Sequence, residues 1–136
     1  MRKAPVFFVF LTLIAVALLL PQPAAAQKKP ILVGFPMFLT GGGALFGQPS
    51  KVGAEMYVKE INEKGGVLGR PIELLIRDCK GTPDEATRVA RELIAKENVQ
   101  FLVGGLTAAQ GLALSEVAKT EKILYVAPIS KSTAMT

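Results

Sequence analysis

The chain has 136 residues, of which half are hydrophobic, and carries a formal net charge of +5. This composition is typical of a globular protein, and the interspersed charges of both signs are expected to be solvated helix faces, which disfavours nucleic-acid binding. Histidine is absent and cysteine occurs once, so the sequence holds neither a metal-ligand cluster nor an evident acid–base pair. We therefore expect no metal, no cofactor and no enzymatic activity.

The first 26 residues have the parts of a secretion signal. Arg2 and Lys3 precede the apolar run 6–20, and a small-residue A-x-A pattern ends at Ala26. A membrane anchor is the alternative, but the run is shorter than the roughly 20 residues that a membrane-spanning helix needs. We expect cleavage after Ala26, a periplasmic location, and a mature part formed by residues 27–136.

Short apolar runs alternate with helical patterns along the mature part. In chain order the pattern predicts a strand at 31–35 closed by Pro36, a helix over 48–64, a strand at 71–78, a helix beginning at Pro83, a strand at 99–104, a helix following Thr107, and a strand at 123–126. The predicted core-facing residues are Val52, Met56, Tyr57 and Ile61 on the first helix, Ala86, Val89, Ala90, Leu93 and Ile94 on the second, and Leu112, Ala113 and Val117 on the third.

Two helix starts carry capping signals. Thr82 precedes Pro83 and stands three residues before Glu85, which is the spacing of a capping box. Thr107 and Gln110 repeat that spacing. Each box is expected to satisfy two backbone amides that the helix itself leaves without an acceptor.

Strands that alternate with helices form right-handed crossovers, and these predict an α/β fold with a doubly wound parallel sheet in the order 2-1-3-4 and helices on both faces. The chain leaves the first and third strands in opposite directions, so a crevice is expected at their carboxyl ends. The loops 36–46, 105–109 and 127–131 should meet there. Amides at the start of the Thr107 helix suit a carboxylate or another anion.

Three local features admit more than one interpretation. The glycines 41–43 lack both the dinucleotide and the P-loop patterns, so they are expected to allow backbone to approach either a solute or a neighbouring loop. Cys79 is expected to be a small buried residue at a strand end, with a reactive thiol as the alternative. Asp78 is expected to be structural, through capping or pairing with a loop amide.

A family resemblance is carried by two segments: GFPMFLTGGGALFGQPSKVGAEMYVKEINEKGGVLGRPIELLIRDCKGTPDEATRVARELI and FLVGGLTAAQGLALSEVAKTEKILYVAPIS. Both resemble the leucine/isoleucine/valine-type periplasmic binding proteins. The resemblance implies the truncated first lobe of a type 1 periplasmic-binding fold, from a two-lobed receptor that delivers a branched-chain or related amino acid, or a small carboxylate, to the membrane subunits of an ABC importer. An extracytoplasmic ligand-sensing domain of a signalling system is the alternative.

The resemblance also implies a ligand site in this lobe. Its residues would be Phe46, Ala108, Ile129, Ser130 and Lys131, to which the predicted crevice adds Thr107 and Ala109 at the start of the helix. Phe46 keeps the family's aromatic wall, whereas Ala108 replaces a serine that grips the ligand carboxylate and Lys131 replaces a threonine. Ser130, Ser132 or Thr133 would supply the hydroxyl if the loop shifts, and Lys131 would favour an acidic ligand. Some relatives pair a cysteine at the position of Cys79 with one at the position of Thr107.

Overall fold

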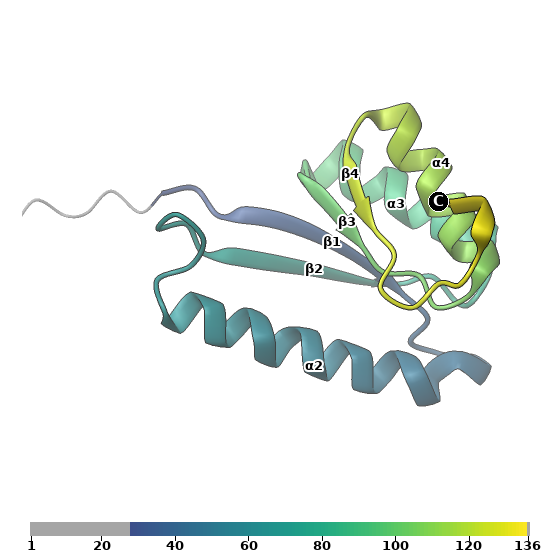
Figure 1. Ribbon diagram of the computed structural model, residues 1–136, viewed down its shortest axis with the longest axis horizontal. Coiled ribbons are helices and arrows are strands. Elements are labelled where there is room, and N and C mark those ends of the chain that lie inside the picture. Colours follow the sequence, from purple (N-terminus) through teal and green to yellow (C-terminus); the bar gives the residue numbers. More distant parts are fainter. Residues whose placement is uncertain (1–27, 136) are drawn as a thin grey trace, which may run out of the picture.

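Four parallel strands form a sheet in the order β2-β1-β3-β4, as the sequence predicts. The computed structural model describes residues 28–135, so the predicted leader and its cleavage point lie outside the described residues. The elements are β1 (Ile31–Met37), η1 (Gly41–Gly43), α2 (Ala44–Glu63), β2 (Ile72–Asp78), α3 (Pro83–Glu97), β3 (Phe101–Val103), α4 (Ala108–Glu121), β4 (Leu124–Val126) and η2 (Thr133–Met135). Figure 1 shows α2 on one side of the sheet and α3 and α4 on the other, which confirms the predicted layers.

The first strand is longer than predicted. β1 continues through Pro36 to Met37 instead of ending at Phe35, and its last four residues are buried. Proline lacks an N–H group, which normally excludes it from a central strand. Here the ladder to β3 includes only Val33 and Gly34 of β1, and the Pro36 carbonyl accepts the Gly105 amide at 3.0 Å. Pro36 therefore lies beyond the part of β1 that pairs with β3, and its carbonyl is still paired.

The main core lies between the sheet and the helices α3 and α4. The predicted inner face of α3 is confirmed, because Ala86, Val89, Ala90 and Leu93 are all buried and Ile94 packs beside them. On α4 the prediction is correct for Val117, whereas Leu112 and Ala113 are only half-buried. The buried leucine of α4 is Leu114, which the helical spacing did not predict.

Helix α2 differs from its prediction in both its start and its orientation. It begins at Ala44 rather than Gln48, because η1 leads directly into it. Val52, Met56 and Tyr57, predicted to face the core, are 52%, 67% and 65% exposed. Of the four predicted positions only Ile61 is half-buried, together with Ala54 and Val58, which the spacing did not predict.

The extent of the sheet explains this error. Helix α2 packs mainly on β2, and Figure 1 shows it running along that edge of the sheet, away from β3 and β4. On β3 and β4, Leu102 and Tyr125 point toward the α3–α4 core, so their neighbours in the strands point to the α2 side. Among those neighbours Phe101, Leu124 and Val126 are 37%, 60% and 48% exposed. Within residues 28–135, no helix fully covers these three side chains.

The two predicted capping boxes have different outcomes. The one at Thr107 is complete, with both reciprocal bonds to Gln110 present. At Thr82 only half of the box forms, since the Thr82 hydroxyl accepts the Glu85 amide at 3.2 Å while the Glu85 carboxylate pairs with Arg88. The Thr82 amide donates instead to the Cys79 carbonyl at 3.3 Å. Both helices start where predicted, but the Thr82 amide is paired with a backbone carbonyl instead of the Glu85 side chain.

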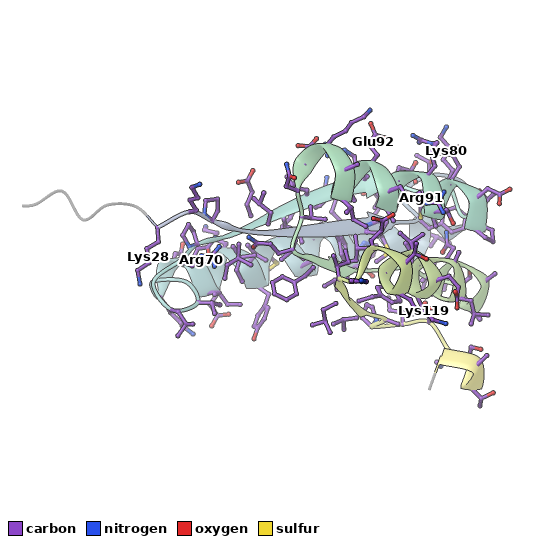
Figure 2. The ribbon with its side chains drawn as sticks, turned by 90° about the horizontal axis from the view of Figure 1, so that it is seen from above. Lys28, Arg70, Lys80, Arg91, Glu92 and Lys119 are labelled. Atoms are coloured by element: carbon purple, nitrogen blue, oxygen red, sulfur yellow. The ribbon has the colours of Figure 1, made fainter. Side chains whose placement is uncertain are left out.

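The ends of the sheet are distinct in structure. At the amino ends of β1 and β2, Arg70 donates to the Lys29 and Pro30 carbonyls at 2.8 and 3.1 Å, and Lys28 donates to the Leu68 carbonyl. Figure 2 shows Lys28 and Arg70 at this end and Lys80, which follows β2, at the opposite one. The candidate site lies at the Lys80 end.

Candidate ligand-binding site

Three loops meet at the carboxyl ends of β1, β3 and β4 and line a shallow, open pocket of about 450 Å³. Its lining residues are Phe38, Gly42, Gly43, Phe46, Leu106, Thr107 and Ile129. Each of the three loops that the topology places at the crevice contributes at least one of them. The structure therefore confirms that these three loops converge at one end of the sheet.

The first wall is built from an aromatic ring packed on glycines. A Cβ atom at Gly43 or Gly81 would overlap the Phe38 ring, so glycine at these positions allows the ring to lie flat between them. Phe38 also packs against the buried core, whereas Phe46, on the first turn of α2, is 65% exposed. Phe38 is thus a fixed part of the wall, and Phe46 presents a free aromatic face.

Asp78, the last residue of β2, holds the loop that carries this wall. Its carboxylate accepts the Leu39 amide at 3.0 Å, the Lys80 amide at 2.9 Å and the Thr40 hydroxyl. Partial burial by itself would raise the pKa of Asp78, but these hydrogen bonds outweigh it and hold that pKa below the usual 3.8. The prediction that Asp78 pairs with a loop amide is correct.

The second wall is the turn that precedes α4, and a buried glutamine organises it. The Gln110 Oε1 atom accepts the amides of Leu106 and Thr107 at 3.0 and 3.1 Å, and its Nε2 group donates to the Cys79 sulfur at 3.2 Å. Cys79 is fully buried, as predicted, and burial raises the pKa of its thiol above 9.0, with the Asp78 charge acting in the same direction. A neutral thiol in this position is a packing and hydrogen-bonding group.

The third loop contributes Ile129, which is 36% exposed. The neighbouring Ser130 hydroxyl turns inward and donates to the Gly105 carbonyl at 3.4 Å, while the Tyr125 hydroxyl donates to the Gly104 carbonyl at 2.9 Å. Lys131 is exposed and stands outside the set of pocket-lining residues. The loop therefore offers the pocket an apolar side chain.

The structure thus brings three of the seven sequence-predicted residues, Phe46, Thr107 and Ile129, into one pocket. Ala108 and Ala109 follow Thr107 in the first turn of α4, and Ser130 lies beside the pocket against the Gly105 carbonyl. The residue-level prediction missed the lining residues Phe38, Gly42, Gly43 and Leu106, although they fall in the predicted loops. A large aromatic residue just before a run of glycines is the signal that indicates the first three.

Chemically, the pocket is equipped to hold an apolar body. Within the part of the chain that the structure describes, none of the lining residues is ionisable, and no group of three His, Cys, Asp or Glu residues is placed to bind a metal ion. The Thr107 hydroxyl is the lining side-chain polar group, and it already accepts the Gln110 amide at 3.2 Å. None of the helices in residues 28–135 is long and apolar enough to cross a membrane.

A doubly wound sheet with a loop-lined pocket at the carboxyl ends of its strands is the arrangement in which open α/β folds bind small molecules. Residues 30–135 match the family model described as periplasmic binding protein, and the chain belongs to that family. The predicted family and its type 1 fold are thereby confirmed.

Similar proteins agree with this assignment. Over 113 residues the chain is 32% identical to a Leu/Ile/Val-binding protein of Rhizobium johnstonii, covering 83% of this chain and 30% of that protein. Among solved structures, it is similar to the branched-chain amino acid transporter substrate-binding protein LivJ of Streptococcus pneumoniae in complex with isoleucine, with a TM-score of 0.74, 28% identity, and coverage of 78% of this chain and 30% of that one.

A second similar structure is a solute-binding protein of an ABC transporter from R. palustris in complex with 4-hydroxybenzoate. Its TM-score is 0.70 at 28% identity, with 79% of this chain and 29% of that chain covered. The chain therefore spans about 30% of the length of the relatives that it matches. These relatives are solute-binding proteins, and their family is extracytoplasmic.

Proposed function

We propose that this chain forms the first lobe of an extracytoplasmic solute-binding component of an ABC importer, and that its pocket receives a branched-chain or related amino acid or a small carboxylate. In this proposal residues 1–26 are a signal peptide cleaved after Ala26 and residues 27–136 form the lobe. The observation that carries it is the apolar pocket formed jointly by three loops at the carboxyl ends of β1, β3 and β4. The family assignment alone leaves open whether this lobe retains a usable pocket.

The walls of the pocket support a ligand with an apolar body. Phe38, Phe46 and Ile129 present aromatic and aliphatic carbon, and Phe46 has most of its surface free for contact. Burial of such side chains against a ligand is favourable by about 25 cal/mol per Å² of apolar surface. An aliphatic side chain and an aromatic ring both satisfy this requirement.

The start of α4 supports a carboxylate at the other end of the ligand. Ala108 and Ala109 are the first two residues of this 14-residue helix, and the backbone amides of a first turn lack acceptors within their own helix. Their N–H groups and the positive end of the helix dipole favour an anion. Isoleucine and 4-hydroxybenzoate, the ligands of two similar structures, each combine an apolar body with a carboxylate.

Binding without chemistry is the activity that these groups support. A pocket lined by apolar side chains, glycines and one threonine offers neither a general base nor an activated nucleophile. The solute-binding relatives support the same inference, and their ABC transporter systems make importer membrane subunits the proposed partners. One lobe supplies only part of the walls that enclose a ligand, so the second lobe of a complete receptor would close over the solute.

Isothermal titration calorimetry tests the proposal with leucine, isoleucine, 4-hydroxybenzoate and the dicarboxylate succinate. The titration uses the chain itself and a chimaera in which this lobe replaces the matching lobe of the isoleucine-binding relative. Saturable binding of a monocarboxylate supports the proposal, and absence of binding in both proteins contradicts it. Preference for succinate that disappears in Lys131→Thr would instead support the acidic ligand that Lys131 predicts.

A further inference from the structure

Among residues 28–134, Gln110 is the one polar side chain in the fully buried set, with 0% of its surface exposed. A buried amide costs stability unless its donors and acceptor are paired. The Oε1 atom has two backbone partners, Leu106 and Thr107, and the Nε2 group has the Cys79 sulfur. The Gln110 side chain therefore bonds to the turn before α4, which forms one wall of the pocket, and to the residue that follows β2.

These contacts exceed what a helix cap requires. A capping box needs only the reciprocal bonds between residues 107 and 110. The additional bond to the Leu106 amide reaches a residue that lines the pocket, and the bond to Cys79 joins α4 to a residue 31 positions away at the end of β2. The Gln110 side chain therefore connects the second wall of the pocket to the sheet.

The same strand end also anchors the first wall. Asp78, which precedes Cys79, binds the Leu39 amide, and the Cys79 amide donates to the Met37 carbonyl at 3.0 Å. The loop carrying Phe38 is thus held by Asp78, and the loop carrying Leu106 is held by Cys79 through Gln110. This common base sets the separation between the two walls.

We propose that Gln110 is a positioning residue of the solute pocket, which orients Leu106 and Thr107 through its hydrogen bond to Cys79. The inference rests on the proposed function for its effect on a ligand, whereas the orientation itself is testable without one. Gln110 does not line the pocket, so its influence on a solute passes through the turn that it holds.

The decisive variants are at Cys79, because they leave both Gln110 and the two amides in place. Hydrogen exchange is followed by NMR in the full chain. In Cys79→Ala the Nε2 group loses its acceptor, and the amides of Leu106 and Thr107 are expected to exchange roughly tenfold faster, as for the loss of one buried hydrogen bond. In Cys79→Ser an acceptor is retained, and their exchange is expected to stay within about threefold of the original chain.

If packing alone controlled the exchange, these amides would exchange at least as fast in Cys79→Ser as in Cys79→Ala, since serine suits an apolar site less well than alanine. Equal exchange in the two Cys79 variants, or faster exchange spread evenly over the whole chain, would overturn the proposal. Gln110→Met gives a second test, with Gln100→Met as its matched control. Gln100 also accepts a backbone amide, that of Leu32 at 3.3 Å, but it is exposed and lies at the far end of the sheet.

Calorimetry with the tightest-binding solute of the panel supplies the ligand readout. Gln110→Met and Cys79→Ala are expected to weaken binding about tenfold, while Gln100→Met and Cys79→Ser change it by less than about threefold. Faster exchange at Leu106 and Thr107 with unchanged affinity would refute the positioning role. If neither the original chain nor the chimaera binds any solute of the panel, the proposed function fails, and the exchange of the Cys79 variants still decides whether Cys79 orients Gln110.

Discussion

The Asp78 carboxylate accepts the backbone amide of Leu39 at 3.0 Å, across a separation of 39 residues in the chain. This bond joins the end of β2 to the loop that follows β1, at the edge of the pocket. Two further donors, the Lys80 amide and the Thr40 hydroxyl, complete the set. A single carboxylate thereby fixes the loop that positions Phe38 and Phe46.

Asp78→Asn is expected to lower the free energy of unfolding at pH 7 by about 1–3 kcal/mol, the contribution of hydrogen bonds to a charged group. The pKa of Asp78 is lowered in the folded chain. Its stabilisation is therefore complete above the unfolded pKa of about 3.9 and is lost as the pH falls through the folded pKa.

Urea unfolding of both proteins between pH 7 and pH 2.5 measures this difference. The advantage of the original chain should be constant at neutral pH and shrink below about pH 4. Asp84→Asn, at an exposed position in the first turn of α3, is the control. A difference between the original chain and Asp78→Asn that is the same at every pH would contradict the assignment.

Gly34→Ala is expected to destabilise the fold through overpacking. Its Cβ would lie 2.9 Å from Leu102 Cδ2 and 3.2 Å from Leu93 Cδ1, both in the buried core, and such overpacking typically costs about 1–3 kcal/mol. Gly53→Ala, in the middle of α2 with open space around its Cβ, is expected to raise stability by up to about 1 kcal/mol. Chemical denaturation compares the two, and equal effects would mean that the steric contact at Gly34 is absent.

Thr82→Ala removes the side-chain cap of α3. Loss of the bond from the Glu85 amide is expected to lower the free energy of unfolding by about 1 kcal/mol. Thr120→Ala, at an exposed hydroxyl that donates to the Glu116 carbonyl near the end of α4, should change it by less than about 0.5 kcal/mol. Thermal melts of both variants distinguish the cap from a general effect of removing a hydroxyl.

Phe46→Ala separates ligand binding from stability. Phe46 lines the pocket and is largely exposed, so its loss is expected to weaken solute binding about three- to tenfold with a shift in stability below about 0.5 kcal/mol. Leu45→Ala is the matched control, because Leu45 is 82% exposed and does not line the pocket. Equal loss of affinity in both variants would place the ligand elsewhere.

Local patterns predicted most of the fold. Capping residues such as Thr82 and Thr107 marked helix starts, and alternating strands and helices led to the parallel order β2-β1-β3-β4. The same topology placed three loops at one end of the sheet. These inferences succeed because helix capping and the handedness of crossovers depend on neighbouring residues and on chain connectivity.

The orientation of α2 depended on the extent of the sheet. Its sequence carries two apolar stripes, and spacing cannot indicate that the stripe with Met56 is exposed while the one with Val58 lies nearer β2. The burial of Gln110 was equally invisible, because a polar residue enters a core only where distant partners satisfy it.

By itself, then, the sequence determined the order of the elements, the direction of the strands and the end of the sheet at which the pocket lies. Only the tertiary structure showed that Phe38, Gly42, Gly43 and Leu106 complete the pocket, and that Cys79, just after β2, meets Gln110 on α4. Secondary structure and crossovers arise from interactions between residues close along the chain, whereas burial and side-chain pairing depend on which segments meet in space.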